Sequence, residues 1–177
     1  MLRRASLELA SRSVALTSVA RTTRSLAAVD KLLSASGATH YMLALDWTQP
    51  GEFLRLIHQH LSQTRKPDLV VAWLHDEELA IRFAVDLDAS EPLCRFFHVV
   101  GSATADPYLL AAKSRDRLSR SKVAYHQVIL GYVAEGGTAR WLTNDEISAG
   151  AIDAIARSEP EHVVGTVRPW SIRPKSE

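Results

Sequence analysis

The segment from Pro67 to Gly101 constrains the fold most, because it carries three apolar runs that predict consecutive β-strands. Leu69 to Leu74 is an unbroken apolar run, which is typical of a central strand covered on both faces. From Leu79 to Asp88 apolar residues occupy alternate positions, which predicts a strand with one face on the core. Cys94 to Val100 predicts the third strand. Because the connections are short, we expect an antiparallel meander.

The flanking segments supply further strands and the helices. An Asp106-Pro107 pair predicts a helix start, and Thr143 to Glu146 is a capping box, in which a hydroxyl and a carboxylate satisfy free amides. Gly136-Gly137 predicts a hairpin turn. The predicted elements are helices at 27–35, 48–63, 106–118 and 143–159 and strands at 39–47, 123–133, 139–142 and 162–167.

Together these elements predict one α+β domain. The expected fold has a central, mainly antiparallel sheet of about five to six strands with about three to four helices. A length of 177 residues is enough for a single domain with its own core and short for two. We expect a basic N-terminal helix or targeting segment at 1–28, the α+β domain at 29–167 and an exposed tail at 168–177.

Residues 1–28 differ in composition from the rest of the chain. Five arginines stand against a single acid, Glu8, among many Ser, Thr, Ala and Leu residues, which is typical of a mitochondrial presequence. A helix that packs on the domain or on a partner is the alternative. The lone Cys94 excludes an internal disulfide and favours a reducing compartment. We therefore expect a cytoplasmic protein, with the mitochondrial matrix as the alternative location.

The overall charge does not indicate a polyanion as ligand, because the net charge is only +1. No apolar run approaches the length needed to span a bilayer, so no integral membrane segment is expected. The basic segment 113–122 is a local exception. Its Arg115, Arg117 and Arg120 could contact the phosphates of a nucleic acid. A solvated helix end, favoured by the helix dipole, is the other interpretation.

Acidic residues lie at the ends of two predicted neighbouring strands. Asp68 follows Pro67, and Asp86-Leu87-Asp88 ends the next strand. Acids at strand ends can bind a divalent cation that activates water for phosphodiester cleavage. This order resembles the PD-(D/E)xK nucleases and would imply a metal-dependent nuclease, although Asp88 stands where that family has its lysine. Solvated edge or turn residues are the alternative.

The histidines and the cysteine form no recognisable catalytic or metal-binding set. His58 and His60 lie two apart on a predicted helix, so their side chains point in different directions. Cys94 could be a nucleophile paired with His98 or His126, but a cysteine that opens an apolar strand is typically a buried hydrophobe. No glycine-rich phosphate loop occurs. We therefore expect no catalytic residue, no metal ligand and no cofactor.

Trp170 lies in the predicted tail, where it could anchor a partner, because a large aromatic side chain in a pocket often dominates an interface. It could equally fold back on its own domain. Without a coherent enzymatic site, the leading hypothesis is a noncatalytic accessory subunit that docks on protein partners, or on itself, through its N-terminal helix and C-terminal tail. The nuclease and a nucleic-acid-binding protein are the alternatives. The expected partner-binding residues are Arg115, Arg117, Arg120 and Trp170.

Overall fold

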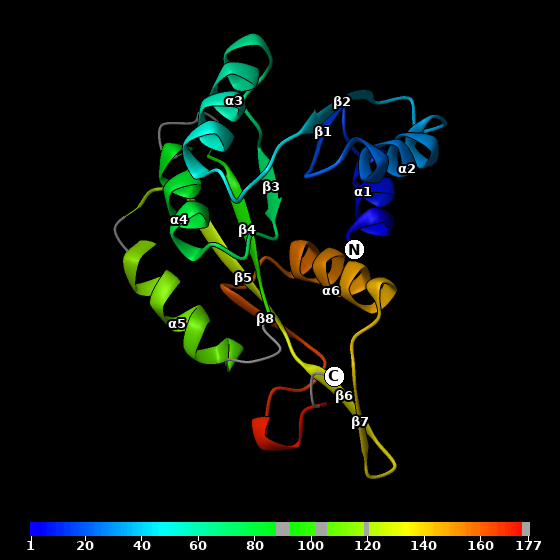
Figure 1. The fold of residues 1–177 in the computed structure, drawn as a ribbon, viewed down its shortest axis with the longest axis vertical. Coiled ribbons are helices and arrows are strands. Elements are labelled where there is room, and N and C mark those ends of the chain that lie inside the picture. Colours follow the sequence, from blue (N-terminus) through cyan, green and yellow to red (C-terminus); the bar gives the residue numbers. More distant parts are fainter. Residues whose placement is uncertain (88–92, 102–105, 119–120, 175–177) are drawn as a thin grey trace. The chain divides into compact units, whose positions relative to one another are not determined.

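The computed structural model describes residues 1–87, 93–101, 106–118 and 121–174. It divides the chain into two compact units, Met1–Arg65 and Lys66–Glu177. Each unit contains its own parallel sheet (Figure 1).

The first unit is a pair of parallel strands with helices packed against them. Strands β1 and β2 pair in register from Ala15↔Thr39 to Ala20↔Ala44. Helices α1 and α2 pack against β1 and against each other. The elements are α1 (Arg3–Ala10), β1 (Ala15–Ala20), α2 (Thr23–Leu33), β2 (Thr39–Ala44) and α3 (Pro50–Gln63).

Local sequence signals explain where the helices of this unit begin and end. Thr22 caps α2, because its hydroxyl oxygen accepts a hydrogen bond from the Ser25 amide at 3.2 Å. After α2, Gly37 takes a positive φ of 72°, which a glycine adopts without strain. Pro50 stands at the first position of α3, where its missing N–H costs nothing. His60 links α3 to the strands, with Nε2 2.9 Å from the Thr17 hydroxyl.

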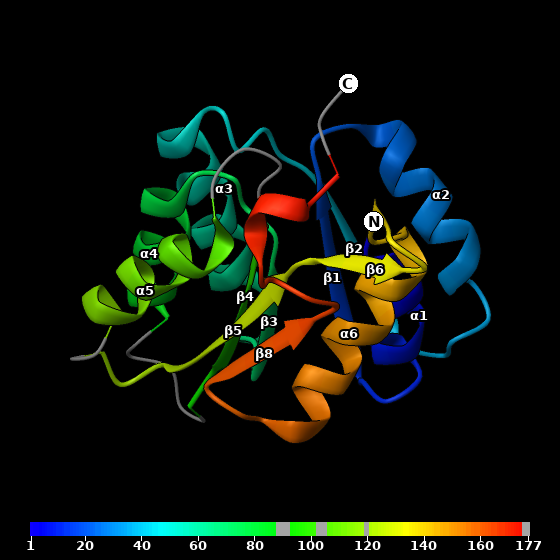
Figure 2. The same cartoon turned by 90° about the horizontal axis from the view of Figure 1, so that it is seen from below.

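The second unit is a four-stranded parallel sheet in the order β3-β4-β5-β8. Figure 2 shows α4 and α5 on one side of this sheet and α6 on the other. The main elements are β3 (Leu69–Ala72), α4 (Glu77–Asp86), β4 (Arg95–Val100), α5 (Pro107–Leu118), β5 (Ala124–Leu130), α6 (Asn144–Arg157) and β8 (Glu161–Val164).

The core of the second unit lies on the two central strands, β4 and β5. Phe96, Phe97, Val128 and Ile129 are wholly buried. Phe83 of α4 packs edge-on against Phe96, with the ring centroids 5.7 Å apart. Burial on both faces explains why these strands are apolar at successive positions instead of alternate ones.

A hairpin and the C-terminal segment complete the second unit. The predicted hairpin is confirmed: β6 (Tyr132–Glu135) pairs with β7 (Thr138–Trp141), and Gly136 and Gly137 both take positive φ in the turn. The predicted capping box at the start of α6 is also confirmed. Beyond β8, a 3₁₀ turn, Trp170–Ile172, places the Trp170 ring 6.0 Å from that of Tyr132 and 6.1 Å from that of Trp141.

The predicted antiparallel sheet is wrong, because the segment expected to be its second strand is helix α4. Asp76 caps this helix by accepting a hydrogen bond from the Leu79 amide at 3.0 Å, and Glu77 and Glu78 complement the helix dipole. The apolar residues between 79 and 87 satisfy a helical period as well as an alternating one, which misled the prediction. A helix between β3 and β4 lets the two strands run parallel.

Among the described residues, the structure also contains more helices and strands than the sequence predicted. Residues 1–28 form α1, β1 and the start of α2. Among the described residues no helix is both long and apolar enough to cross a membrane. The domain boundaries at 28/29 and 167/168 stay predictions.

Candidate functional site

The most distinctive group of charged side chains in the first unit lies where its two parallel strands end. Strand β1 ends at Ala20 and is followed by Arg21, and β2 is followed by Leu45 and Asp46. The Leu45 amide donates to the Ala20 carbonyl at 3.0 Å, which extends the pairing to the last residue of β1. Because carboxyl ends of parallel strands share one edge of a sheet, Arg21 and Asp46 leave the sheet at the same edge.

The N terminus of α2 lies directly after Arg21. The first turn of this helix contains no acid, and its Arg24 side chain is exposed. The free amides of a helix start and the positive end of its dipole favour an anion. Arg21 and Arg24 therefore add formal positive charge to a helix end that is already electropositive.

Asp46 is the acidic member of this edge. Hydrogen bonds from the Thr48 backbone (3.0 Å) and hydroxyl (2.8 Å) lower the pKa of Asp46, and the charge of Arg21 acts in the same direction. The carboxylate is therefore ionised at neutral pH and can accept hydrogen bonds from a hydroxyl or an amine. An edge with two exposed arginines, a helix N terminus and one fixed carboxylate suits a phosphorylated ligand that also carries donors.

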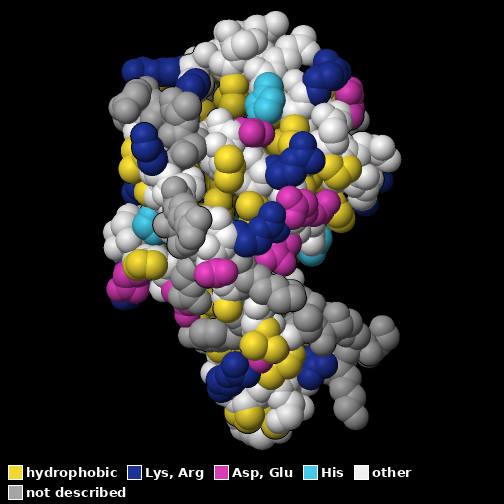
Figure 3. All heavy atoms as spheres, turned by 90° about the vertical axis from the view of Figure 1, so that its left-hand side faces the viewer, with side chains coloured by type: hydrophobic (Ala, Val, Ile, Leu, Met, Phe, Trp, Pro, Cys, Tyr) yellow, Lys and Arg dark blue, Asp and Glu magenta, His cyan; other side chains and the backbone are white. Residues whose placement is uncertain are grey.

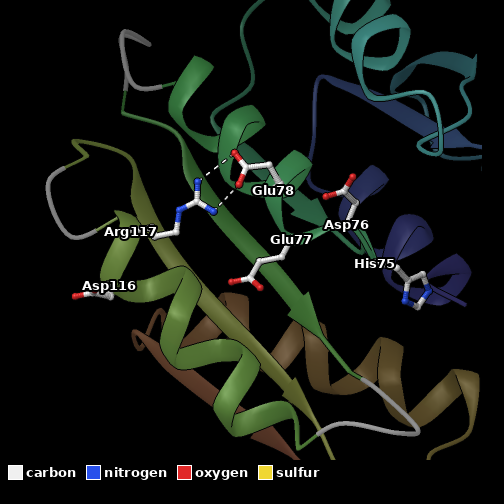
Figure 4. Close-up of a pocket in the computed structure, with 6 residues that line it drawn as sticks. All are labelled: His75, Asp76, Glu77, Glu78, Asp116 and Arg117. Atoms are coloured by element: carbon white, nitrogen blue, oxygen red, sulfur yellow. Dashed lines mark hydrogen bonds and ion pairs between the residues drawn. The ribbon is translucent and has the colours of Figure 1, made fainter.

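The corresponding strand end in the second unit has the opposite charge. The N terminus of α4 opens into a shallow pocket of about 590 Å³ (Figure 4). Arg117 of α5 donates to Glu78 at 2.6 and 3.1 Å, and Ser114 donates to Glu77 at 2.9 Å. Asp116 points away from the other side chains in this view. The lining residues are His75, Asp76, Glu77, Glu78, Asp116 and Arg117.

Three polar side chains of the second unit form a hydrogen-bonded chain on the face of the sheet that α5 covers. His98 on β4 lies 2.7 Å from the Tyr125 hydroxyl and also hydrogen-bonds the backbone of Leu74, just after β3. Gln127 continues the chain by donating to the Tyr125 hydroxyl and to the Ala111 carbonyl of α5. Burial lowers the pKa of His98 to about 4, so its imidazole is neutral at physiological pH. Neutral His98 thus joins the strand end at Leu74 to the sheet.

The acids of the nuclease hypothesis do not meet as that hypothesis requires. Asp68 lies exposed before β3, whereas Asp86 ends helix α4 instead of a strand. Asp88 lies outside the described residues. In the described part of the chain, no group of His, Cys, Asp and Glu side chains could hold a metal ion. Burial raises the pKa of Cys94 to about 11, so its thiol is protonated at neutral pH.

The predicted partner-binding residues are not brought together. Arg117 is engaged with Glu78, and Trp170 packs within its own unit, with the Arg173 guanidinium 5.2 Å from its ring. Arg120 and the side chain of Arg115 lie outside what the structure describes. On the face that carries α4 and α5, basic and acidic side chains are interspersed (Figure 3). Binding of a partner by these residues stays a prediction.

Sequence reasoning missed Arg21 and Asp46. Arg21 was counted only as part of a basic N-terminal composition. The available signal was local: a short run at 15–20 with the β-branched Thr17 and Val19, then Arg21 and the capping Thr22, then a helical pattern. That signal predicts a strand-to-helix turn with a basic residue at its tip.

No protein-family model and no curated protein matches this chain. Several solved structures, however, are similar to it in fold. The bulky-bulky ketone specific alcohol dehydrogenase from Comamonas testosteroni superposes with a TM-score of 0.68 in its orthorhombic crystal form, at 13% identity over 93% of this chain and 82% of that one. Its tetragonal form gives a TM-score of 0.66 at 13% identity, with the same shares covered. A metagenomic short-chain oxidoreductase in complex with NADP gives 0.61 at 16% identity, over 93% and 91%.

This likeness identifies the fold as Rossmann-like, of the short-chain dehydrogenase kind. It agrees with the parallel sheets and overturns the predicted antiparallel α+β fold. The hypothesis of a noncatalytic accessory subunit is corrected as well, since the solved structures that share this fold are described as dehydrogenases and oxidoreductases and not as accessory subunits. The same finding corrects the two alternative hypotheses, a metal-dependent nuclease and a nucleic-acid-binding protein.

Proposed function

We propose that the protein is an oxidoreductase of the nicotinamide-dinucleotide class and that its first unit holds the adenosine end of NADP(H). The observation that carries this proposal is Arg21, which follows strand β1 at the start of α2. In Rossmann-like sheets an acid in this region binds the ribose 2′-hydroxyl of NAD, whereas an arginine accommodates the 2′-phosphate of NADP. The likeness to dehydrogenases supports the reaction class.

The other residues of this edge fit the same ligand. Arg24 and the amides at the start of α2 add positive potential for a phosphate. Asp46, held ionised by Thr48, offers an acceptor to a hydroxyl or to the exocyclic amine of a base. A dianionic 2′-phosphate would therefore meet two arginines, while the uncharged part of the nucleoside meets the carboxylate.

The fit does not extend to the pyrophosphate. A Rossmann site holds the pyrophosphate on a Gly-x-Gly-x-x-Gly turn at a helix N terminus, and the 177-residue sequence contains no such run. The N terminus of α1 is preceded by Leu2, which makes no side-chain capping bond, and opens with Arg3 and Arg4. The nicotinamide of a bound cofactor would supply hydride chemistry, but we derive no step through it from these residues.

Calorimetry with nucleotide fragments tests the proposal. Adenosine 2′,5′-bisphosphate is expected to bind residues 1–177 at least about tenfold more tightly than adenosine 5′-monophosphate, because a charged hydrogen bond contributes about 1.5–3 kcal/mol. Arg21→Ala should remove this preference. Arg12→Ala is the matched control, because Arg12 lies at the amino end of β1 and pairs with Glu8. Equal affinity for the two fragments would contradict the proposal.

Self-association and a cytoplasmic location, with the mitochondrial matrix as the alternative, remain part of this proposal. The arginine-rich composition of residues 1–28 supports the matrix alternative. Light scattering on the purified chain and imaging of a C-terminal fluorescent fusion test the two points.

A further inference from the structure

Helix α1 carries a pattern of residues that occurs once in the chain (Figure 1). Arg3 and Arg4 precede Ser6 by three and two positions, and Leu7 follows it. They are the one pair of adjacent arginines in the sequence, so no other serine or threonine has arginines at both of these positions. Two guanidinium groups before a hydroxyl form an acceptor segment that the carboxylates of a serine kinase can select.

Both arginines are accessible to a partner protein. Their side chains are exposed. Glu8, the acid of this helix, pairs with Arg12 at 2.5 Å instead of with either of them. Guanidinium groups form bidentate hydrogen bonds with carboxylates. An acidic groove on a kinase can therefore contact Arg3 and Arg4 without breaking the Glu8–Arg12 ion pair.

Ser6 itself is held by a hydrogen bond in the first turn of α1. Its side chain is half-buried, and Oγ donates to the Leu2 carbonyl at 3.0 Å. In phosphoryl transfer the attacking oxygen must lie in line with the leaving group and give up its proton. Ser6 therefore becomes an acceptor when the turn from Leu2 to Ser6 opens.

This turn has few interactions that keep it closed. Leu2 stands at the N-cap without a side-chain hydrogen bond, and the first turn holds no acid. Arg3 and Arg4 place positive charge at the positive end of the helix dipole, which is unfavourable. A serine that bonds back to a carbonyl four residues earlier adds little stability to a helix. Opening of the first turn of α1 therefore costs little free energy.

We propose that Ser6 is a phosphorylation site for a serine kinase that selects paired arginines. In the reaction Ser6 Oγ bonds to the γ-phosphorus of ATP, and the bond from this phosphorus to the oxygen that leaves with ADP breaks. The hydroxyl proton passes to the catalytic carboxylate of the kinase. The products are phosphoserine and ADP. This proposal is independent of nucleotide binding at Arg21, because it rests on α1 alone.

The phosphate changes the electrostatics of the first turn of α1. It carries a charge of about −1.5 to −2 at neutral pH, which offsets the two guanidinium groups and complements the helix dipole. Loss of the Ser6–Leu2 hydrogen bond acts in the opposite direction, but this bond contributes little. The electrostatic gain is the larger effect, so phosphorylation is expected to stabilise the start of α1.

Phosphorylation of the purified chain gives the first test. Residues 1–177 are incubated with ATP and a serine kinase of this selectivity, and mass spectrometry counts and locates the phosphoryl groups. We expect one group, at Ser6, and none in Ser6→Ala. The double variant Arg3→Gln, Arg4→Gln should react at least about tenfold more slowly, because charged hydrogen bonds to the kinase are lost.

Arg12→Gln is the matched control for the arginine pair, because it also removes one charge from the same segment but lies after the acceptor. Its rate should equal that of the parent chain. An unmodified parent, equal labelling of Ser6→Ala, or an equal loss of rate in Arg12→Gln would each overturn the proposal. Labelling of Ser13 at the rate of Ser6 would do so as well, since a single arginine precedes Ser13.

A new N-cap tests whether the turn must open. Leu2→Ser supplies a capping hydroxyl, whereas Leu2→Ala removes the same side chain without a cap. Phosphorylation of Leu2→Ser should be about fivefold slower than that of Leu2→Ala, because a cap contributes about 1 kcal/mol to a helix start. Equal rates in the two variants would overturn the opening step.

Amide hydrogen exchange tests the effect of the phosphate on α1. Exchange at the Leu7 amide, in the turn after the acceptor, should slow by about two- to fivefold after phosphorylation. Ser25, at the start of α2, is the internal control, and its exchange should not change. Faster exchange at Leu7 would show that the phosphate opens α1 and would overturn the proposed stabilisation.

Discussion

Two helices begin at corresponding places in the two units and present opposite charges. Both α2 and α4 follow a parallel strand and have a side-chain N-cap. The cap of α2 is a neutral threonine preceded by Arg21, and its first turn holds no acid. The cap of α4 is Asp76, followed by Glu77 and Glu78.

Backbone geometry alone therefore does not make an anion site. Each helix start offers free amides and a positive dipole end. At α4 the three carboxylates neutralise this potential and stabilise the helix itself. At α2 the potential remains available, and Arg21 and Arg24 increase it. Of these two helix starts, that of α2 is therefore the one suited to a phosphate.

The largest expected effect is the pH dependence of stability that comes from His98. Its neutral imidazole hydrogen-bonds the backbone of Leu74, just after β3. The pKa of His98 is about 4 in the fold and about 6.5 when unfolded, so the unfolded chain binds more protons between these values. Stability from this group is fully present above pH 6.5 and is lost as the pH falls toward 4, by up to roughly 3 kcal/mol. Urea denaturation at several pH values measures it.

His98→Gln should flatten this pH dependence, because glutamine does not titrate. His75→Gln, in the exposed turn after β3, is the matched control and should leave the dependence as it is. An unchanged slope in His98→Gln would assign the pH effect to another group.

The next effect comes from giving α2 the charge pattern of α4. Arg24→Glu places an acid in the first turn, where it opposes a bound phosphate but complements the helix dipole. We expect adenosine 2′,5′-bisphosphate binding to weaken by about tenfold or more, with unfolding free energy unchanged or raised by a few tenths of a kcal/mol. Arg24→Gln should give an intermediate affinity. A loss of both binding and stability would indicate a structural role instead.

A smaller effect is expected at the cap of α4. Asp76→Ala leaves the Leu79 amide without its acceptor and should cost about 1 kcal/mol of unfolding free energy. Asp76→Asn keeps a capping oxygen and removes the charge, so its stability should lie close to that of the parent. If Asn destabilised as much as Ala, the charge and not the cap would be what holds this helix start.

The smallest effect is expected at the Arg117–Glu78 pair. Both side chains are about half exposed, and exposed ion pairs contribute little to stability. Arg117→Gln should leave the denaturation midpoint within experimental error. A clear loss of stability would mean that the ion pair contributes more to the free energy of unfolding than exposed pairs usually do.

Signals carried by a few neighbouring residues predicted their elements correctly. The capping box of α6, the Gly136-Gly137 hairpin and the start of α5 at Pro107 needed no knowledge of distant contacts. The segment 79–88 failed because its apolar residues fit two periods, and the deciding signal was the Asp76 cap just before it. The sequence offered no view of which strands pair.

The positions of most helices and strands can be predicted from the sequence, because caps, turns and periodic patterns act over a few residues. The sequence also shows that β3 has the composition of a central strand. Tertiary structure places the strands in parallel and brings Arg21 and Asp46 to the same end of one sheet, although 24 residues lie between them in the chain. Strand pairing joins residues far apart in the chain, so no local pattern contains it.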